Sequence, residues 1–274
     1  MPRHVLNGAA LHYSDDDFSD AWTGPQPAVI LLHGFCRSGE LWRGWVPHLA
    51  RRYRVIRPDL RGCGGSSDPG PEYEYTLDGL VADLTALLDT LHIADVHFIG
   101  EGLGAVMSTI IATREPARVR SLTLLSLPTR VGPSMQDIYR LEYATWQEAL
   151  AQVGVETWWR RARKLTGDLT GNAALDNYLA TQVGRTPVHV AVGLSHCGTS
   201  WDLAQILPHV TAPILLVGPE QTLFTSAEQQ SQLASLAPHA QLRVYPEIRQ
   251  QFFMYTDPDL FAPAVAAFID GVGG

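Results

Sequence analysis

The chain has few cysteines, no long apolar run and no excess of basic residues. Its 274 residues include three cysteines, Cys36, Cys63 and Cys197, an odd number without the spacing of a metal site. This usage is typical of a reduced protein, and we expect a cytoplasmic location. No apolar run approaches the roughly 20 residues that a membrane-spanning helix needs. The formal net charge of −8 provides no basic surface, so we expect neither nucleic acid nor a membrane as a partner.

Cofactor motifs are missing as well. The sequence contains no dinucleotide fingerprint, no phosphate-binding loop and no metal-ligand cluster. We therefore expect no cofactor and no metal. With 46% hydrophobic residues the chain can bury a large core, and its length fits one α/β domain with an insertion.

Short apolar runs alternate with helical patterns in the first part of the chain and return near its end. One helical pattern places leucines at three- and four-residue steps between Leu77 and Leu91, as in an amphipathic helix that covers a sheet. Such alternation predicts a mostly parallel sheet covered on both faces. The predicted strands are Ala28–Leu32, Tyr53–Ile56, Val96–Ile99, Val119–Leu125, Pro213–Val217 and Gln241–Tyr245.

The stretch from 131 to 201 contains helical patterns without a convincing strand. Examples are Asp137–Ala151 and Val155–Leu165, and four of the seven tryptophans lie in this stretch. We expect a helical cap here, inserted into a core made of residues 1–130 and 202–274. The tryptophans either line a pocket or pack the cap against the core, and packing is their commoner role.

The segment from Val96 to Ala105 has the pattern of a strand, a tight turn and a helix. Its sequence around the turn is Gly100-Glu101-Gly102-Leu103-Gly104, which has the small-x-nucleophile-x-small spacing of a nucleophile elbow. The central residue of such an elbow normally carries a hydroxyl, thiol or carboxylate. Here it is Gly102, which has no side chain to attack with.

These motifs, in this order, resemble the α/β-hydrolase superfamily along most of the chain. Residues 51–133 look most like the branch of 3-oxoadipate enol-lactonases and related esterases. The resemblance implies an α/β-hydrolase fold with an inserted helical cap. The matching segments are Leu32–Phe35 with Trp42, Arg57–Ser67, the elbow, Ala212–Gly218 and Asp257-Pro258.

The resemblance also implies where a catalytic triad would lie. The nucleophile position falls on Gly102, the acid position on Gln221 and the base position on Gln251. An alternative acid position, after the strand 119–125, holds only Ser126. None of these side chains ionises, and loss of a triad lowers the rate about a million-fold. We therefore predict a degenerate triad and no serine-type ester hydrolysis.

The oxyanion hole depends on backbone amides and can survive without the triad. The resemblance assigns its donors to Phe35 and Leu103, the latter at a helix N-terminus. This geometry either binds a ligand oxygen or persists because the fold requires it. The substrate-binding residues that we expect are Phe35, Cys36, Arg37, Gly102, Leu103, Trp146 and Gln251.

Several other residues are candidates for chemistry, each with an ordinary alternative. Arg37 suits a carboxylate ligand, although a surface position is the more ordinary interpretation. Glu101 is a candidate acid or base, or a structural residue facing a neighbouring strand. The candidate catalytic residues are His196 in the cap and Arg249 and Tyr255 near the base position. The ordinary alternative is that these side chains are exposed to solvent or pack in the core.

Two classes of function remain. The first is a non-hydrolytic enzyme, a lyase, cyclase or isomerase that catalyses cyclisation, rearrangement, elimination or decarboxylation of a carbonyl-bearing small molecule, as in secondary metabolism. The second is a non-catalytic small-molecule-binding pseudoenzyme. An ester or lactone hydrolase with a non-standard site is a weaker alternative. The sequence leaves open whether the chain forms a homodimer.

Overall fold

The computed structural model describes residues 3–6, 8–222, 225–248 and 251–272. One sheet has the strand order β1-β2-β4-β3-β5-β6-β7-β8. β2 pairs antiparallel with β1 and with β4, and the other neighbours are parallel. The strands are β1 (Arg3–Leu6), β2 (Ala9–Asp16), β3 (Ala28–Leu32), β4 (Arg54–Pro58), β5 (Val96–Glu101), β6 (Val119–Leu125), β7 (Ile214–Pro219) and β8 (Ala240–Tyr245).

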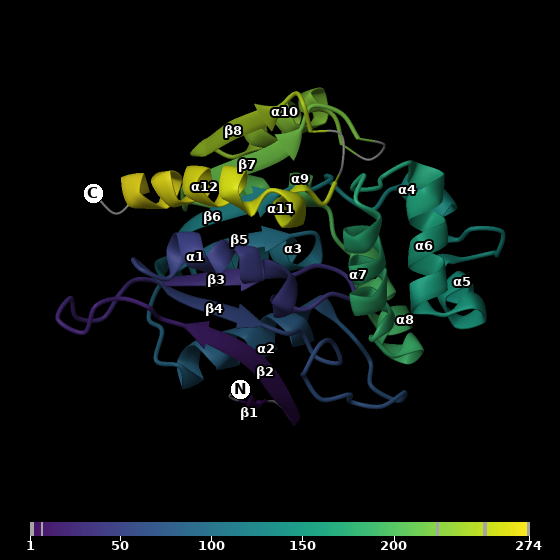
Figure 1. The fold of residues 1–274 in the computed structure, drawn as a ribbon, viewed down its shortest axis with the longest axis horizontal. Helices are drawn as coiled ribbons and strands as arrows, with labels where there is room; N and C mark the ends of the chain where they lie inside the picture. Colours follow the sequence, from purple (N-terminus) through teal and green to yellow (C-terminus); the bar gives the residue numbers. More distant parts are fainter. Residues whose placement is uncertain (1–2, 7, 223–224, 249–250, 273–274) are drawn as a thin grey trace.

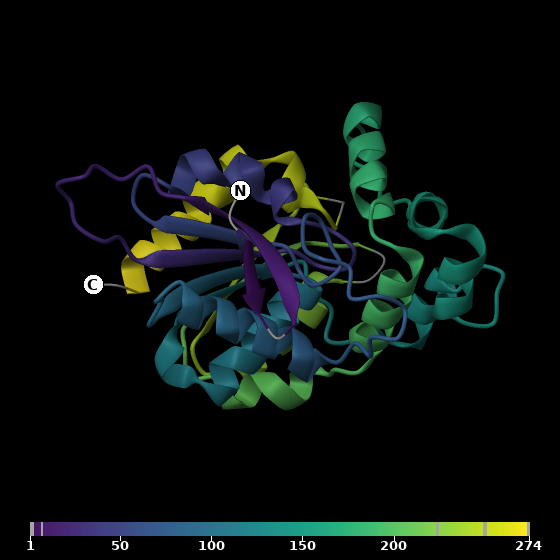
Figure 2. The same ribbon diagram turned by 90° about the horizontal axis from the view of Figure 1, so that it is seen from below.

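Helices cover both faces of this sheet, as the sequence predicts (Figures 1 and 2). α1 (Val46–Leu49) and α12 (Pro258–Val272) pack together on one face. α2 (Leu77–Thr90) and α3 (Leu103–Arg114) pack together on the other. The remaining core helices are α9 (Leu203–Ile206), α10 (Ala227–Leu236), α11 (Phe253–Thr256) and the 3-10 turns η1 (Gly39–Trp45), η2 (Pro116–Arg118) and η3 (Leu207–His209).

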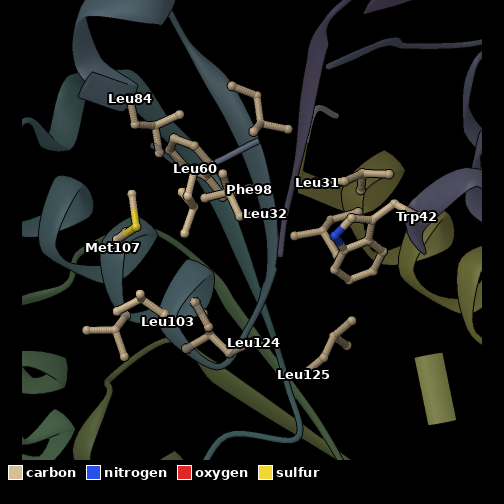
Figure 3. Packing of buried hydrophobic residues seen from close by; sticks show 14 of the residues in the cluster. Leu31, Leu32, Trp42, Leu60, Leu84, Phe98, Leu103, Met107, Leu124 and Leu125 are labelled. Atoms are coloured by element: carbon tan, nitrogen blue, oxygen red, sulfur yellow. The ribbon is translucent and has the colours of Figure 1, made fainter. Parts of the chain in front are cut away.

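The central strands are buried from end to end because both faces of the sheet are covered. Every residue of β3 and β5 is buried. Figure 3 shows Leu31 and Leu32 on opposite sides of the sheet, and Leu124 and Leu125 alternate in the same way. Successive side chains of a strand point to opposite faces, so each strand contributes to two apolar layers.

Five helices lie between β6 and α9, at the end of the molecule drawn in teal and green in Figure 1. No strand occurs among the described residues of this stretch. We call these five helices the cap. They are α4 (Pro133–Tyr139), α5 (Trp146–Val153), α6 (Val155–Thr166), α7 (Ala173–Gly184) and α8 (Val188–Thr199).

The structure differs from the predicted elements in two places. It adds the strands β1 and β2, which no predicted strand covers. The predicted helix Asp137–Ala151 is two helices, α4 and α5. Leu141 has φ +54° between them, and the Thr145 hydroxyl accepts a hydrogen bond from Glu148 N at 3.1 Å, which caps a new helix start.

Among the described residues, no helix is long and apolar enough to cross a membrane.

Candidate functional site

The turn between β5 and α3 keeps the backbone geometry of an elbow. Gly102 has φ +51° and ψ −122°, a conformation that L side chains rarely adopt. A Cβ atom at Gly102 would have one neighbour within 4 Å, Gly34 Cα at 3.7 Å. Space for a side chain is therefore present at the elbow, and the side chain is missing.

The two flanking glycines are required by packing. A Cβ at Gly100 would lie 2.7 Å from Ala105 N, and one at Gly104 would lie 2.6 Å from Leu32 Cβ. Both distances are far inside van der Waals contact. The small residues of the elbow motif thus reflect close packing of α3 against β5 and β3, independent of any chemistry at Gly102.

Two backbone amides border the elbow. Leu103 is the first residue of α3, where N–H groups lack partners within the helix. Phe35 follows β3, and both residues line the same pocket. Within the described part of the chain, neither amide donates a hydrogen bond. That both amides bind one oxygen atom stays a prediction.

A buried histidine holds the loop that carries Phe35. Leu60 N donates to His33 Nε2 at 2.9 Å, so the proton lies on Nδ1, which donates to Gly34 O at 2.8 Å. Burial lowers the pKa of His33 below its ordinary value. The neutral ring therefore fixes the path of the loop past the elbow.

The pocket lies between the elbow and the cap and is a cavity of about 90 Å³. Seven of its twenty lining residues are aromatic. Trp146 and Trp158 have ring centroids 5.6 Å apart, and Phe35 packs on Trp146 at 4.8 Å. The aromatic residues that line it are Phe35, Tyr139, Trp146, Trp158, Trp159, Trp201 and Phe252.

A buried acidic network lies beside the elbow. Glu101, 4% exposed, lines the pocket. Arg37 Nη1 donates to both of its carboxylate oxygens, at 2.7 and 2.9 Å, and Gly34 N and the Tyr255 hydroxyl donate to Oε1, the latter at 3.0 Å. Four hydrogen bonds therefore hold the Glu101 side chain in place next to Gly102.

This network corrects the ordinary interpretation of two residues. Arg37 is not a surface arginine, since it is 6% exposed and lines the pocket. Glu101 reaches the loop after β3 and not merely a neighbouring strand. A Cβ at Gly34 would lie 2.7 Å from Arg37 Nη1 and from both Glu101 oxygens, so the pair fits only beside glycine.

A second ion pair at the pocket was missed from the sequence. Arg163 of α6 lines the pocket, and its Nη1 lies 2.5 Å from Asp168 Oδ2, in the turn after the helix. Asp168 Oδ1 also accepts a hydrogen bond from Gln251 N at 2.8 Å. Both charged side chains are less than a tenth exposed. The only signal in the sequence was an arginine on the same helix as Trp158 and Trp159.

The structure separates the residues at the three positions where the resemblance predicts a triad. Gly102 and Gln251 line the pocket. Gln221 does not line it, is exposed, and its Nε2 donates to Thr222 O at 2.9 Å. Ser126, the alternative acid position, is buried with φ +48° and also lies outside the lining.

The other candidates have mixed placements. Tyr255 supports Glu101 from outside the lining, and burial raises the pKa of its hydroxyl well above the ordinary value. The side chain of His196 is exposed and borders a separate hollow between α8 and residues 71–76. Cys36 is fully buried behind the loop and does not line the pocket. Arg249 lies outside the described residues.

The described residues contain no group of three or more histidine, cysteine or acidic side chains that could hold a metal ion. All three cysteines are free and buried. Burial raises the pKa of Cys63 to about 12 and that of Cys197 to about 11. These thiols are therefore protonated and unreactive near neutral pH.

Comparisons with known proteins agree with the fold. A family model described as the alpha/beta hydrolase fold matches residues 27–249. The chain belongs to the α/β-hydrolase fold family. Among solved structures, the enol-lactonase from Burkholderia xenovorans LB400 superposes with a TM-score of 0.85 at 23% identity, over 98% of this chain and 100% of that one. The predicted α/β-hydrolase fold is confirmed.

Most of the curated relatives of this α/β-hydrolase-fold chain match half of its length or less. Epoxide hydrolase 2 of Siraitia grosvenorii is 41% identical over 125 residues, 44% of this chain and 36% of that protein. The first such relatives are matched over 21 to 42% of their own length. A probable esterase of Oryza sativa subsp. japonica is 28% identical over 213 residues, 71% of this chain and 73% of that protein.

Proposed function

We propose that this α/β-hydrolase is an enzyme that catalyses a non-hydrolytic reaction on a carbonyl-bearing small molecule. The reaction types in question are cyclisation, rearrangement, elimination and decarboxylation. One observation carries the proposal: the elbow keeps its conformation and its pocket at Gly102, but offers no nucleophile. Covalent acyl transfer needs an attacking side chain and a base that activates it, and this elbow has neither.

The amides of Phe35 and Leu103, which donate to no described residue, support binding of a carbonyl oxygen. Both border the pocket, and Leu103 lies at the N-terminus of α3. N–H groups and the helix dipole at such a position stabilise negative charge as it develops on oxygen. An enolate or a related intermediate is stabilised there without a covalent bond to the protein.

Glu101 is the group that we assign to proton transfer. Its carboxylate lines the pocket next to Gly102, within reach of a carbonyl compound held at the elbow. Arg37 and Tyr255 hold the carboxylate in place and are positioning residues in this mechanism. Gln221 and Gln251, at the acid and base positions, do not ionise, so Glu101 is the remaining acceptor beside the elbow.

The test combines active-site labelling with the mass of the product. We expect no covalent labelling by a fluorophosphonate and no hydrolysis of p-nitrophenyl acetate. With a panel of β-keto acids and 1,3-dicarbonyl compounds, we expect products of unchanged mass, or of the substrate mass less water or carbon dioxide. Glu101→Gln lowers turnover by about a hundredfold or more, while the exposed Glu142→Gln serves as the control.

Products that gain one water would contradict the proposal and would indicate a hydrolase with a non-standard site. The second candidate function is a non-catalytic small-molecule binder. It is favoured by the four hydrogen bonds that engage Glu101 and by the position of His196 outside the pocket. Ligand binding by the wild-type protein without turnover of any carbonyl compound would establish that alternative.

A further inference from the structure

We infer that Arg37 and Arg163 form an anion subsite in the pocket, and that the ligand is a flat conjugated anion, a carboxylate or enolate on an aromatic frame. The inference rests on the proposed function only in taking this pocket as the ligand site. It adds the charge and the shape of the ligand.

The two guanidinium groups are arranged around the same two rings. Arg37 Cζ lies 4.3 Å from the ring centroid of Phe252 and 5.1 Å from that of Trp159. Arg163 Cζ lies 4.0 and 5.1 Å from the same two centroids. Arg37 comes from the loop after β3 and Arg163 from cap helix α6, so the subsite spans core and cap.

Both arginines are buried and one has unused donors. Arg37 is 6% exposed and Arg163 is 8% exposed. Glu101 accepts hydrogen bonds from Nη1 of Arg37. The buried Nε of Arg37 has no hydrogen-bond partner among the described residues, and the Nη2 of Arg37 bonds to no described residue. Buried donors without a partner cost free energy, and a carboxylate accepts two parallel N–H bonds from one guanidinium fork.

The charged groups around the pocket are balanced in pairs. Arg37, Arg163 and Glu101 are the charged residues that line it, and Asp168 neutralises Arg163 from outside the lining. Burial lowers the pKa of Arg163 to about 10, and the charge of Arg37 adds to this lowering against the opposing effect of Asp168. Each arginine is already paired with one carboxylate, so the pocket offers an anion the unused N–H donors of Arg37 and not an excess of positive charge.

The rest of the pocket selects a flat frame. Trp146 and Trp158 stack with an interplanar angle of 25°, and Tyr139 packs on Trp146 at 4.8 Å. Aromatic walls of this kind favour offset or edge contacts with another conjugated ring. A conjugated frame against these walls, with its anionic oxygen toward the arginines, satisfies both parts of the pocket.

The test compares two probes that share one ring system, one with an anionic carboxylate and one with a neutral amide that donates hydrogen bonds as well as accepting them. 2-Naphthoate and 2-naphthamide have the same ring system, and binding is followed by quenching of tryptophan fluorescence. We expect the wild-type protein to bind the carboxylate about tenfold more tightly or better, as a charge-assisted bidentate contact allows. The paired variant Arg163→Gln/Asp168→Asn removes both charges of the cap pair and should reduce this preference.

Controls keep the outcome clear. Arg161→Gln changes an exposed arginine on the same helix and should leave the preference intact. Arg163→Lys keeps the positive charge and should keep part of the preference for the carboxylate. If the paired cap variant fails to fold, Arg37→Gln/Glu101→Gln tests the same subsite from the core side, with far-UV circular dichroism to verify folding.

Equal affinity of wild-type protein for the two probes would overturn the inference, and so would an unchanged preference in both paired variants. These results are separate from the test of the proposed function. A carboxylate preference without turnover of any carbonyl compound would support the anion subsite and contradict the proposed enzymatic function. Turnover without a carboxylate preference would contradict the anion subsite but not the proposed enzymatic function.

Discussion

At the scale of single residues, Gly102 separates the geometry of the elbow from its chemistry. The backbone turns as it would around a nucleophile, with φ +51°, and the neighbouring Gly100 and Gly104 are held by close contacts. These contacts depend on the packing of α3 against the sheet. The fold and the pocket therefore do not depend on a side chain at residue 102.

The strain at this position gives a prediction. Gly102→Ala forces an L residue into a conformation that it rarely adopts, and should lower the free energy of unfolding by about 1–3 kcal/mol. Urea unfolding measures the change. Gly271→Ala is the control, because Gly271 lies near the end of α12 with ordinary φ and open space around it, and should be neutral or stabilising by up to about 1 kcal/mol. Equal stability of wild type and Gly102→Ala would show that the turn relaxes.

At the scale of elements, one acidic residue of the cap contacts both a cap helix and a loop of the core. Asp168 follows α6, pairs with Arg163 of that helix and accepts a hydrogen bond from Gln251 N, just before α11. The turn after a cap helix is thereby tied to the loop that carries the base position. The shape of the pocket thus depends on a contact between segments 83 residues apart.

Removal of this contact should destabilise the protein and loosen the cap. Asp168→Ala leaves Arg163 as a buried unpaired charge, a change that costs about 3–5 kcal/mol. Urea unfolding and limited proteolysis of residues 131–201 measure the effect. Asp137→Ala removes an exposed partner of Arg140 and should change stability by less than about 0.5 kcal/mol. Similar results for the two variants would mean that the ion pair does not secure the cap.

At the scale of the whole molecule, a buried histidine makes stability depend on pH. His97 lies on β5, is 2% exposed and shares a hydrogen bond of 2.8 Å with Ser121 Oγ. Burial lowers the pKa of His97 to about 4, compared with about 6.5 in an unfolded chain. Between these values the unfolded chain binds a proton that the folded chain does not.

Stability should therefore fall as the pH falls from about 6.5 to about 4. The contribution of His97 to the free energy of unfolding drops by about 3 kcal/mol over that range. Urea unfolding at a series of pH values measures the slope, and His97→Gln should reduce it by about one proton. The exposed His209→Gln is the control, and an unreduced slope in His97→Gln would contradict the assignment.

Local patterns were enough to predict the parallel strands of the sheet and the elbow between β5 and α3. Strands and helices follow from periodic apolar residues, and the elbow follows from Gly100, Gly102 and Gly104 at fixed spacing, because each depends on neighbours along the chain. The glycine at position 102 of the elbow is evident from the sequence itself.

The tertiary structure alone decided how the pocket is charged. Arg37 and Glu101 are 64 residues apart, and Arg163, Asp168 and Gln251 come from the cap and from a late loop. Whether an arginine pairs in the interior or faces solvent depends on which loops converge, and periodicity carries no information about that. For the same reason His196, on a cap helix over the core, was a plausible base in the sequence and is exposed at a separate hollow in the fold. The direction of a helix face is fixed by the partner it packs against, which only the folded chain supplies.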